Sequence, residues 1–399
     1  MAADMLKAGQ GLNYPELVRT VAEQSSAAVE WTVDEIGVDY LDHVEQIGGH
    51  SAPRTLTIKS EAGFHFGAEL VRKMLKKARE AGAEIRTQAC LQTLVQDAAG
   101  TVTGVVVREG VFFPKTINGV TKRIGARKGV VLASGGFAND VALRTSQDPR
   151  LTTDVETTNR RGATGEVITE ALRIGAMPVH LSAIQLGPWA TPDEKGSNVG
   201  ANFGTICIFP HGIVVDSGTG QRLMNERADR KLRADAMLAA GRICLGIVDA
   251  QGAAFGDHFL KKCLEKGVVK AFDGLDQLAR YYEVPADALA DTVTGYNRAL
   301  AKGRDLDFGR PVRKGDTPLA QPPFYAIRLW PKIHFTSGGI RIDTAARVIG
   351  INHQPIKGLF AAGEVTGGVH GACRLGSCAI PECLVFGRIA GRSAAAAAG

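Results

Sequence analysis

The sequence lacks the features that mark membrane-spanning, secreted and metal-binding proteins. No run approaches the ~18 consecutive apolar residues that a transmembrane helix needs, and residues 1–10 contain no apolar segment of a secretory signal. None of the seven cysteines stands in a Cys-x-x-Cys pair, so zinc ribbons, thioredoxin-like motifs and c-type haem attachment are unsupported. Their odd number and scattered spacing suit a reducing compartment. We therefore expect a soluble, cytoplasmic protein that does not bind a membrane.

The chain also has little excess charge of either sign. Lysine and arginine outnumber aspartate and glutamate by 47 to 41, and a net charge of +6 over 399 residues is too dilute to indicate nucleic acid as a partner. Hydrophobic residues make up 45% and charged residues 22%, which is ordinary for a globular protein of two or three domains. Glycine is unusually frequent at 48 residues, and this indicates many tight turns against a ligand.

Hydrophobic periodicity predicts mixed helices and strands. We expect helix over most of the first sixty residues, with Asn13 as a cap and Pro15 in the first turn. We expect loops over 183–208, because glycine and proline recur there. Further helices are predicted at 64–82, 165–175, 235–241, 259–266, 286–302 and 379–398. Strands are predicted at 91–95, 102–107, 129–133, 359–362 and, as a pair, within 340–351.

The most informative motif is Gly358-Leu-Phe-Ala-Ala-Gly-Glu364. It predicts a buried strand that ends at a glycine, where the backbone can approach a ligand closely. The glutamate that follows can accept hydrogen bonds from the hydroxyls of a sugar alcohol. The helix predicted from about Ala379 would point unpaired N–H groups and a partial positive charge at a ligand, which would stabilise negative charge on a reduced flavin. The alternative is a strand–turn–helix corner without a ligand.

The same segment resembles a known cofactor signature. Ala361-Ala-Gly-Glu-Val-Thr-Gly-Gly-Val-His-Gly-Ala-Cys-Arg-Leu-Gly376, with Phe386-Gly-Arg-Ile-Ala-Gly391, resembles the C-terminal FAD-binding signature of the fumarate reductase/succinate dehydrogenase flavoprotein family, especially its soluble flavocytochrome c fumarate reductase branch. Further stretches resemble this family in the same order: 130–137, 157–166, 222–230 and 333–340. The resemblance extends over about residues 60–391.

The resemblance implies an α/β fold with a succinate dehydrogenase-type FAD-binding domain and an inserted α+β cap domain. The FAD-binding domain is then expected at 1–184 and 333–399, and the cap, or substrate, domain at 185–332, with the active site at their seam. The residues implied to bind FAD are Ser134, Gly135, Gly136, Gly363, Glu364, Gly376, Ser377, Cys378, Ala379 and Ile380.

One part of the family pattern is absent from the sequence. The family opens with a βαβ unit whose Gly-x-Gly-x-x-Gly turn binds the pyrophosphate, and no glycines stand at that spacing here. Three explanations stay open: the polypeptide is truncated, a partner chain supplies the missing unit, or the protein does not hold FAD alone.

Three residues match the family's catalytic positions. Arg230 matches the arginine that donates a proton to the substrate, Arg374 matches the arginine that binds the substrate carboxylate, and His334 matches the histidine that assists it. A guanidinium suits the carboxylate role because it pairs with a planar carboxylate through two hydrogen bonds. The alternatives are a surface arginine on a charged helix for Arg230, a helix-terminal arginine for Arg374 and a core histidine for His334.

Several departures from the family argue against fumarate as the substrate. Gln185-Leu-Gly-Pro188 stands where fumarate-specific members have Gln-Trp-His-Pro, so Gly187 replaces a second carboxylate-binding histidine. We expect this glycine to leave room beside Trp189 for a bulkier, even ring-bearing, substrate. Thr-Ile-Cys-Ile at 205–208 lacks the glutamate–arginine pair that relays protons in the family. Cys378 replaces an asparagine.

Two further groups near the signature receive no firm role. Cys373, Cys378 and Cys383 recur every five residues, a spacing that does not bring three sulfurs to one face, so we expect no metal. His370 is expected near the flavin without a defined role.

The sequence thus predicts an FAD-dependent oxidoreductase acting on a carbon–carbon bond next to a carboxylate or carbonyl, similar to fumarate reductase but not specific for fumarate. Its partners would be a small carboxylate or carbonyl substrate and a chain that supplies electrons or the pyrophosphate-binding unit. The alternatives are a non-catalytic or partner-dependent flavoprotein subunit and a 3-ketosteroid dehydrogenase-like enzyme.

Overall fold

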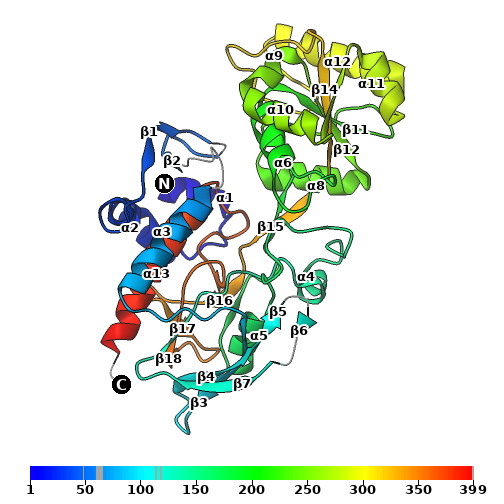
Figure 1. The fold of residues 1–399 in the computed structure, drawn as a ribbon. Helices are drawn as coiled ribbons and strands as arrows, with labels where there is room; N and C mark the ends of the chain where they lie inside the picture. Colours follow the sequence, from blue (N-terminus) through cyan, green and yellow to red (C-terminus); the bar gives the residue numbers. More distant parts are fainter. Residues whose placement is uncertain (48, 60–65, 113–114, 117–118, 398–399) are drawn as a thin grey trace. The chain divides into compact units, whose positions relative to one another are not determined.

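The computed structural model describes residues 1–47, 49–59, 66–112, 115–116 and 119–397 (Figure 1). The chain folds into two compact units. The first comprises Met1–Thr152, Arg161–Gln185 and Phe335–Gly399, and the second comprises Thr153–Arg160 and Leu186–His334. The functional boundaries expected at 184/185 and 332/333 stay predictions, because compactness alone does not assign a cap role.

The first unit combines helices with several small sheets. Its helices are α1 (Ala2–Ala8), α2 (Pro15–Asp34), α3 (Phe66–Glu80), α4 (Val141–Gln147), α5 (Glu166–Arg173) and α13 (Ala379–Ala396). Its strands are β1 (Tyr40–Glu45), β2 (Thr55–Ile58), β3 (Ala89–Gln96), β4 (Val102–Glu109), β5 (Val111–Phe112), β6 (Lys115–Thr116), β7 (Thr121–Gly125), β8 (Val130–Leu132), β9 (Pro178–Val179), β16 (Gly339–Arg341), β17 (Arg347–Ile349), β18 (Pro355–Ala361) and β19 (Thr366–Gly367).

The N-terminal region is only partly helical. Pro15 occupies the first turn of α2 as predicted, but Tyr14 is the N-cap, and the Asn13 amide instead donates to the Val369 carbonyl at 2.8 Å. The prediction of helix over most of the first sixty residues is wrong beyond α2. The physical reason is Gly37, whose φ of +74° ends the helical segment, so that β1 and β2 follow as an antiparallel pair.

Most of the other secondary-structure predictions in this unit are confirmed, and one strand pair is arranged differently from the prediction. The hairpin of β3 and β4 is confirmed, as are α3 and α5, although Phe64, the expected start of α3, lies outside the described residues. The strands expected as a pair within 340–351 exist as β16 and β17 but belong to different sheets. An isolated bridge between Ile342 and Val348 links them.

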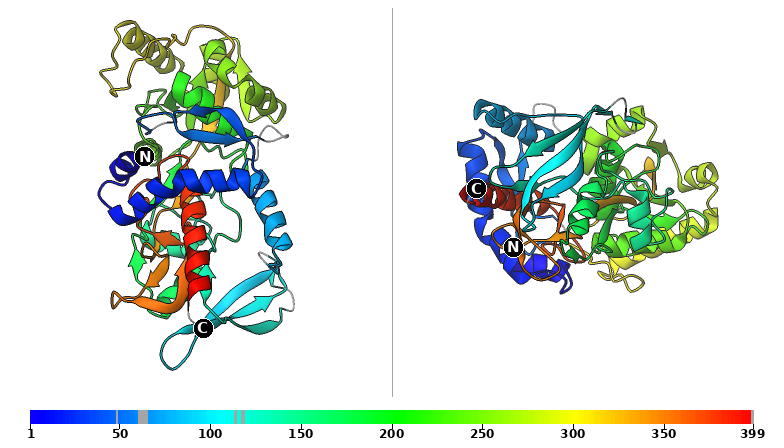
Figure 2. Two further views of the ribbon diagram at one scale, coloured as in Figure 1. Left: turned by 90° about the vertical axis from the view of Figure 1, so that its left-hand side faces the viewer. Right: turned by 90° about the horizontal axis from the view of Figure 1, so that it is seen from below.

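The C-terminal helix α13 is confirmed over its described length; residue 398, the expected end, lies outside the described residues. Its buried residues Leu384 and Val385 form an apolar cluster with Ala28 of α2, and Figure 2 shows the two helices crossing. In the described part of the chain, no helix is both long enough and apolar enough to cross a membrane.

The second unit is built on a four-stranded antiparallel sheet in the order β11-β12-β14-β13. Its strands are β11 (Ile213–Asp216), β12 (Cys244–Val248), β13 (Val269–Phe272) and β14 (Phe324–Leu329). The helices around it are α6 (Val199–Phe203), a π-helix (Gly204–Ile208), α7 (Phe209–His211), α8 (Arg230–Ala240), α9 (Ala250–Ala253), a 3₁₀-helix (Ala254–Gly256), α10 (Asp257–Glu265), α11 (Leu275–Tyr282) and α12 (Ala286–Ala301). Strands β10 (Ile184–Gly187) and β15 (Lys332–Thr336) carry the chain across the boundary between the units.

Sequence periodicity missed this sheet. Every residue of β11 and β12 is buried, so neither strand shows the apolar–polar alternation that identifies a half-buried strand. The loop predicted over 183–208 is also wrong in part, because 199–208 is helical. Val199, Phe203 and Cys207 are all buried there, and their helical spacing outweighs the low helix propensity of the intervening glycines.

Candidate functional site

Two adjacent parallel strands bring the predicted cofactor residues together. Strand β18 pairs with β8 in parallel, with Ala361 opposite Leu132. Because parallel neighbours end at the same edge of a sheet, the segments that follow them, Ser134–Gly136 and Gly363–Glu364, begin at one edge. Ligands of open α/β sheets bind at such carboxyl ends. The structure thus places side by side two segments that are more than two hundred residues apart in the sequence.

The contact between these segments depends on Gly136. A Cβ atom on this residue would lie 2.0 Å from the Thr336 Oγ1 atom and 2.5 Å from the Glu364 Oε1 atom. Neither approach is possible for a real side chain. Gly136 is therefore required where the chain passes the Glu364 carboxylate.

Glu364 is held on one side only. Its Oε1 atom accepts hydrogen bonds from the Thr336 backbone N–H at 2.8 Å and the Thr336 hydroxyl at 3.2 Å. Among the residues that the structure describes, none donates to Oε2. Burial raises the pKa of the Glu364 carboxyl, and the hydrogen bonds from Thr336 oppose that rise. The free oxygen is an acceptor for a hydroxyl-bearing ligand.

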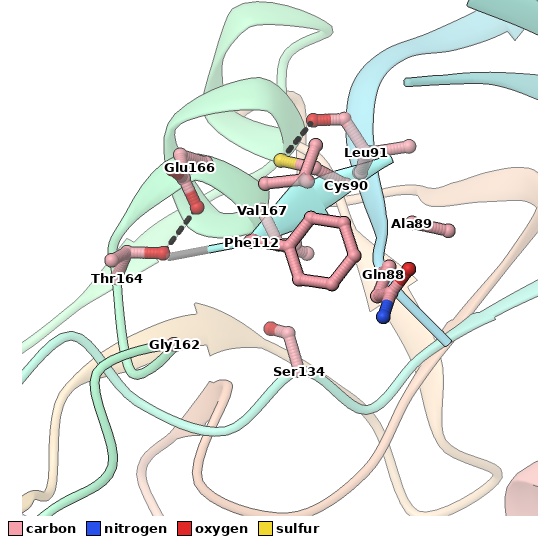
Figure 3. A pocket seen from close by; sticks show the side chains of 11 residues that line it. Gln88, Ala89, Cys90, Leu91, Phe112, Ser134, Gly162, Thr164, Glu166 and Val167 are labelled. Atoms are coloured by element: carbon pink, nitrogen blue, oxygen red, sulfur yellow. Dashed lines mark hydrogen bonds between the residues drawn. The ribbon is translucent and has the colours of Figure 1, made fainter. Parts of the chain in front are cut away.

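A cavity of about 500 Å³ lies beside Ser134 (Figure 3). Figure 3 shows the Ser134 side chain facing the aromatic ring of Phe112, and Thr164 hydrogen-bonded to Glu166. Of the predicted cofactor residues, Ser134 is the one that lines this cavity, together with Gln88, Cys90, Phe112, Thr164 and Glu166. This size and mixed polarity suit part of a large cofactor.

The beginning of α13 carries the remaining predicted cofactor residues. Ser377 adopts a left-handed conformation with φ of +59°, and Cys378 is the N-cap. Burial raises the pKa of the Cys378 thiol to about 11, so it is neutral at pH 7. The first N–H groups of a helix have no partner within it and favour negative charge. Ala379 and Ile380 lie in the first turn of α13, and their role in binding FAD stays a prediction.

Arg374 is a buried cation that forms no ion pair with a carboxylate among the residues the structure describes. Its guanidinium lies 4.9 Å from the centre of the Phe335 ring, and Nη1 donates to the Leu375 carbonyl at 3.3 Å. The Nε atom has no hydrogen-bond partner in the described part of the chain, although the residue is only 7% exposed. Burial lowers the pKa of Arg374, because a charge is costly away from water, and the nearby Glu364 and Glu382 carboxylates oppose that fall.

A second buried pair adjoins Phe335. The His370 Nε2 atom lies 2.9 Å from the Glu382 Oε2 atom, and the His370 ring meets the Phe335 ring edge to face, with 5.4 Å between centres. Sequence reasoning left His370 without a role and missed Glu382 and Phe335. Glu382 could have been suspected, because an acid beside the apolar run at 384–386 of a predicted helix calls for a buried partner.

In the second unit, Trp189 joins two of the predicted catalytic residues. The Arg230 guanidinium lies 4.8 Å from the centre of its ring system, and the His334 ring meets it edge to face at 5.2 Å. Arg230 begins α8, which Asp229 caps. The Thr158 hydroxyl lies 2.9 Å from His334 Nδ1 and so orients the imidazole. The catalytic roles of Arg230, His334 and Arg374 stay predictions.

Gly187 lies directly beside the Trp189 ring. A Cβ atom on Gly187 would lie 3.2 Å from the Cε2 and Cζ2 atoms of Trp189, which is tighter than ordinary contact. Room for a bulkier substrate beside Trp189 stays a prediction. Residues 205–208, where the family has its proton relay, are packed into the interior. Cys207 and Ile208 are fully buried in an apolar cluster, and burial raises the pKa of the Cys207 thiol to about 12.

Comparison with known proteins gives concordant matches. The model of a family described as FAD binding domain matches residues 1–380. The acrylate reductase flavoprotein subunit of Shewanella woodyi is 42% identical over 405 residues, which cover 98% of this chain and 78% of that protein. A fumarate reductase (cytochrome) of Shewanella frigidimarina is 32% identical over 398 residues, covering 99% of this chain and 66% of that protein.

A solved structure shows the same fold. The open conformation of a flavocytochrome c3 fumarate reductase superposes with a TM-score of 0.80 and 33% identity, and the match covers 99% of this chain and 66% of that one. The chain thus spans just under two thirds of the length of the fumarate reductases that it matches.

Proposed function

Because this chain belongs to the FAD binding domain family of flavoproteins, with FAD as its cofactor, we propose that it is a reductase of short 2-enoates. It adds a hydride and a proton across the carbon–carbon double bond next to a carboxylate, so that propenoate becomes propanoate. The likeness to an acrylate reductase flavoprotein subunit supports this substrate class.

The observation that carries the proposal is the buried Arg374 guanidinium, whose Nε has no hydrogen-bond partner among the described residues. This Nε keeps a donor for a ligand, and a carboxylate can accept from the guanidinium through two parallel hydrogen bonds. The Phe335 ring under the guanidinium limits its motion. Arg374 therefore binds and orients the substrate carboxylate.

The other residues take the remaining tasks. FAD, when bound, supplies the hydride. Arg230 delivers the proton to the substrate, a role that an arginine can take only where its charge is strongly destabilised. His334, fixed by Thr158, assists in holding the carboxylate. Glu364 binds a hydroxyl of the cofactor through Oε2, and the N-terminus of α13 favours the negative charge that accompanies flavin reduction.

Substrate range tests the proposal directly. The purified protein, loaded with FAD and supplied with electrons from reduced methyl viologen, should reduce acrylate and show weak or no reduction of fumarate, because Gly187 offers no group to a second carboxylate. Dye oxidation measured against each acid gives the two rates. Equal rates for acrylate and fumarate contradict the assigned specificity. A protein that takes up no FAD, and stays colourless, would instead support the non-catalytic subunit.

Removal of the Glu364 carboxylate should weaken FAD binding. In Glu364→Ala the cofactor loses a charge-assisted hydrogen bond, so we expect its binding free energy to fall by about 1–3 kcal/mol. Titration of the apoprotein with FAD, followed by flavin fluorescence, measures the change. Glu364→Gln keeps an acceptor oxygen, so its affinity for FAD should lie between those of the wild type and Glu364→Ala. Unchanged flavin affinity in Glu364→Ala would show that this carboxylate does not contact the cofactor.

Electrons reach the cofactor from a separate partner in this proposal. The printed name of the Shewanella woodyi relative describes that protein as a flavoprotein subunit, which supports a partner of this kind. A cytoplasmic location is supported by the seven cysteines, all of which are free thiols.

A further inference from the structure

His50 connects the loop between β1 and β2 to the segment that precedes α13. The residue is only 8% exposed, and its Nε2 atom lies 2.9 Å from the Gly376 carbonyl oxygen. Both residues belong to the first unit. A carbonyl oxygen can only accept a hydrogen bond, so Nε2 carries a hydrogen and donates it.

Arg54 determines which form of the His50 imidazole is present. Its Nη1 atom lies 3.0 Å from His50 Nδ1, and because a guanidinium has no acceptor, Nδ1 must accept from it. His50 is therefore the neutral imidazole with its hydrogen on Nε2. Arg54 is ion-paired with Asp4, and hydrogen bonds from Ser51 and Arg54 lower the pKa of the Asp4 carboxyl. Asp4 thus stays charged and holds Arg54 in place.

The hydrogen bond from His50 fixes a peptide group that has a reason to turn over. Ser377, the residue after Gly376, has a φ of +59°, a left-handed conformation that is unfavourable for residues other than glycine. Reversal of the Gly376–Ser377 peptide would bring this φ to a negative, common value, and the glycine before it tolerates the change. Reversal would also break the bond from His50, which therefore opposes it.

The orientation of this peptide decides where the Ser377 N–H points. In a trans peptide the N–H lies on the side opposite the carbonyl, so the Ser377 N–H faces away from His50. Ser377 is exposed, and no described residue accepts from its N–H. Arg374, two residues before Gly376, also has a donor, Nε, without a partner in the described part of the chain. Two donors available to a ligand thus flank Gly376.

We propose that His50 is a positioning residue for the flavin: it keeps the Ser377 N–H available to the cofactor and thereby raises the reduction potential of the bound FAD. This inference rests on the proposed function, in which the start of α13 meets the flavin. A hydrogen bond from an N–H stabilises the negative charge of reduced flavin more than the neutral oxidised form. A reversed peptide would present the Gly376 carbonyl oxygen instead, which repels that charge.

The test separates the two hydrogen bonds of His50. Glutamine can place an amide nitrogen at the position of Nε2 and so reach Gly376, whereas asparagine can place an oxygen only near Nδ1 and reaches only Arg54. The ratio of the affinities for reduced and oxidised FAD should fall at least about tenfold in His50→Asn and His50→Ala, which corresponds to a midpoint potential about 30 mV lower for two electrons. His50→Gln should stay close to the wild type. Spectroelectrochemical titration of the FAD-loaded proteins measures the potential.

A merely structural role for His50 would give a different pattern. His50→Gln and His50→Asn would then both lower Tm, and neither would change the flavin potential. The matched control is His43→Ala, because His43 lies on β1 of the same unit and its Nε2 atom lies 3.4 Å from Glu45 at the surface. Its removal should leave the potential unchanged. Should His50→Ala fail to fold, the comparison of His50→Gln with His50→Asn decides.

The form of the imidazole can be checked without a cofactor. Nitrogen NMR of the histidine-labelled apoprotein distinguishes the two ring nitrogens, and the signals of His50 are those lost in His50→Gln. We expect a hydrogen on Nε2 and none on Nδ1. A hydrogen on Nδ1 would contradict the arrangement from which the proposal is built.

The outcomes separate this inference from the proposed function. A wild type that binds FAD but reduces no enoate overturns the proposed function, while the potentials of the variants still decide the role of His50. A wild type that reduces acrylate, with an unchanged flavin potential in His50→Asn, overturns the role of His50 and leaves the proposed function standing. A wild type that binds no FAD overturns both.

Discussion

Arg230→Ala is expected to lower kcat by about 10²–10⁴-fold, the usual contribution of a positioned proton donor, while the protein keeps its FAD. The role assigned to Arg230 involves the substrate and no contact with the cofactor, so flavin content should not change. Arg230→Lys should fail similarly, because an ammonium group cannot reproduce the planar stacking on Trp189. Steady-state kinetics with acrylate and flavin absorbance of the same samples provide both measurements.

A neighbouring arginine supplies the control for Arg230. Arg233 lies on the same helix and also stacks on an aromatic ring, that of Phe209, at 4.2 Å, so Arg233→Ala removes an equivalent stacking contact without the assigned chemistry. Its kcat should stay close to that of the wild type. If Arg230→Ala retains more than about a tenth of the wild-type rate, a barrier change under ~1.4 kcal/mol, then Arg230 is not the proton donor and orients the substrate instead.

Arg374→Ala should act mainly on substrate binding. Loss of one partner from a desolvated, hydrogen-bonded charge pair costs about 2–5 kcal/mol, so kcat/KM for acrylate should fall by about 30-fold to several thousand-fold. Most of the loss should appear in KM, with some in kcat, because the carboxylate is bound in both the ground state and the transition state. Affinity for propanoate, measured by calorimetry, should fall in parallel.

Thermal stability distinguishes the substrate-binding role of Arg374 from a structural one. In the ligand-free protein Arg374 is a buried charge whose Nε has no partner in the described part of the chain, so its removal relieves an unfavourable desolvation and should leave Tm unchanged or raise it. A clear fall in Tm, with unchanged propanoate affinity, would make Arg374 a structural residue and remove the main support for the proposed function. Arg374→Lys should restore little affinity, because lysine lacks the two-pronged donor geometry.

The local sequence pattern was sufficient to predict a large part of the secondary structure of this protein. The helix α3, the hairpin β3–β4 and the strand β18 that leads into Gly363–Glu364 were all predicted from periodicity and turn residues, because each is specified by neighbours along the chain. The chemistry of the Gly358–Glu364 segment could also be predicted from the sequence. A buried strand followed by glycine and an acid indicates a cofactor edge from residue types alone, and the family assignment followed from the order of such segments.

What the sequence could not determine depends on contacts between residues far apart in the chain. The sheet of the second unit was missed because strands buried on both faces carry no alternation. The pairing of Glu382 with His370 and the stacking of Arg374 on Phe335 join segments that no local rule connects. Gly187 is a further case. The sequence shows that a side chain is missing there, but only the tertiary structure shows that its Cβ direction faces the Trp189 indole, because packing decides which groups surround a position.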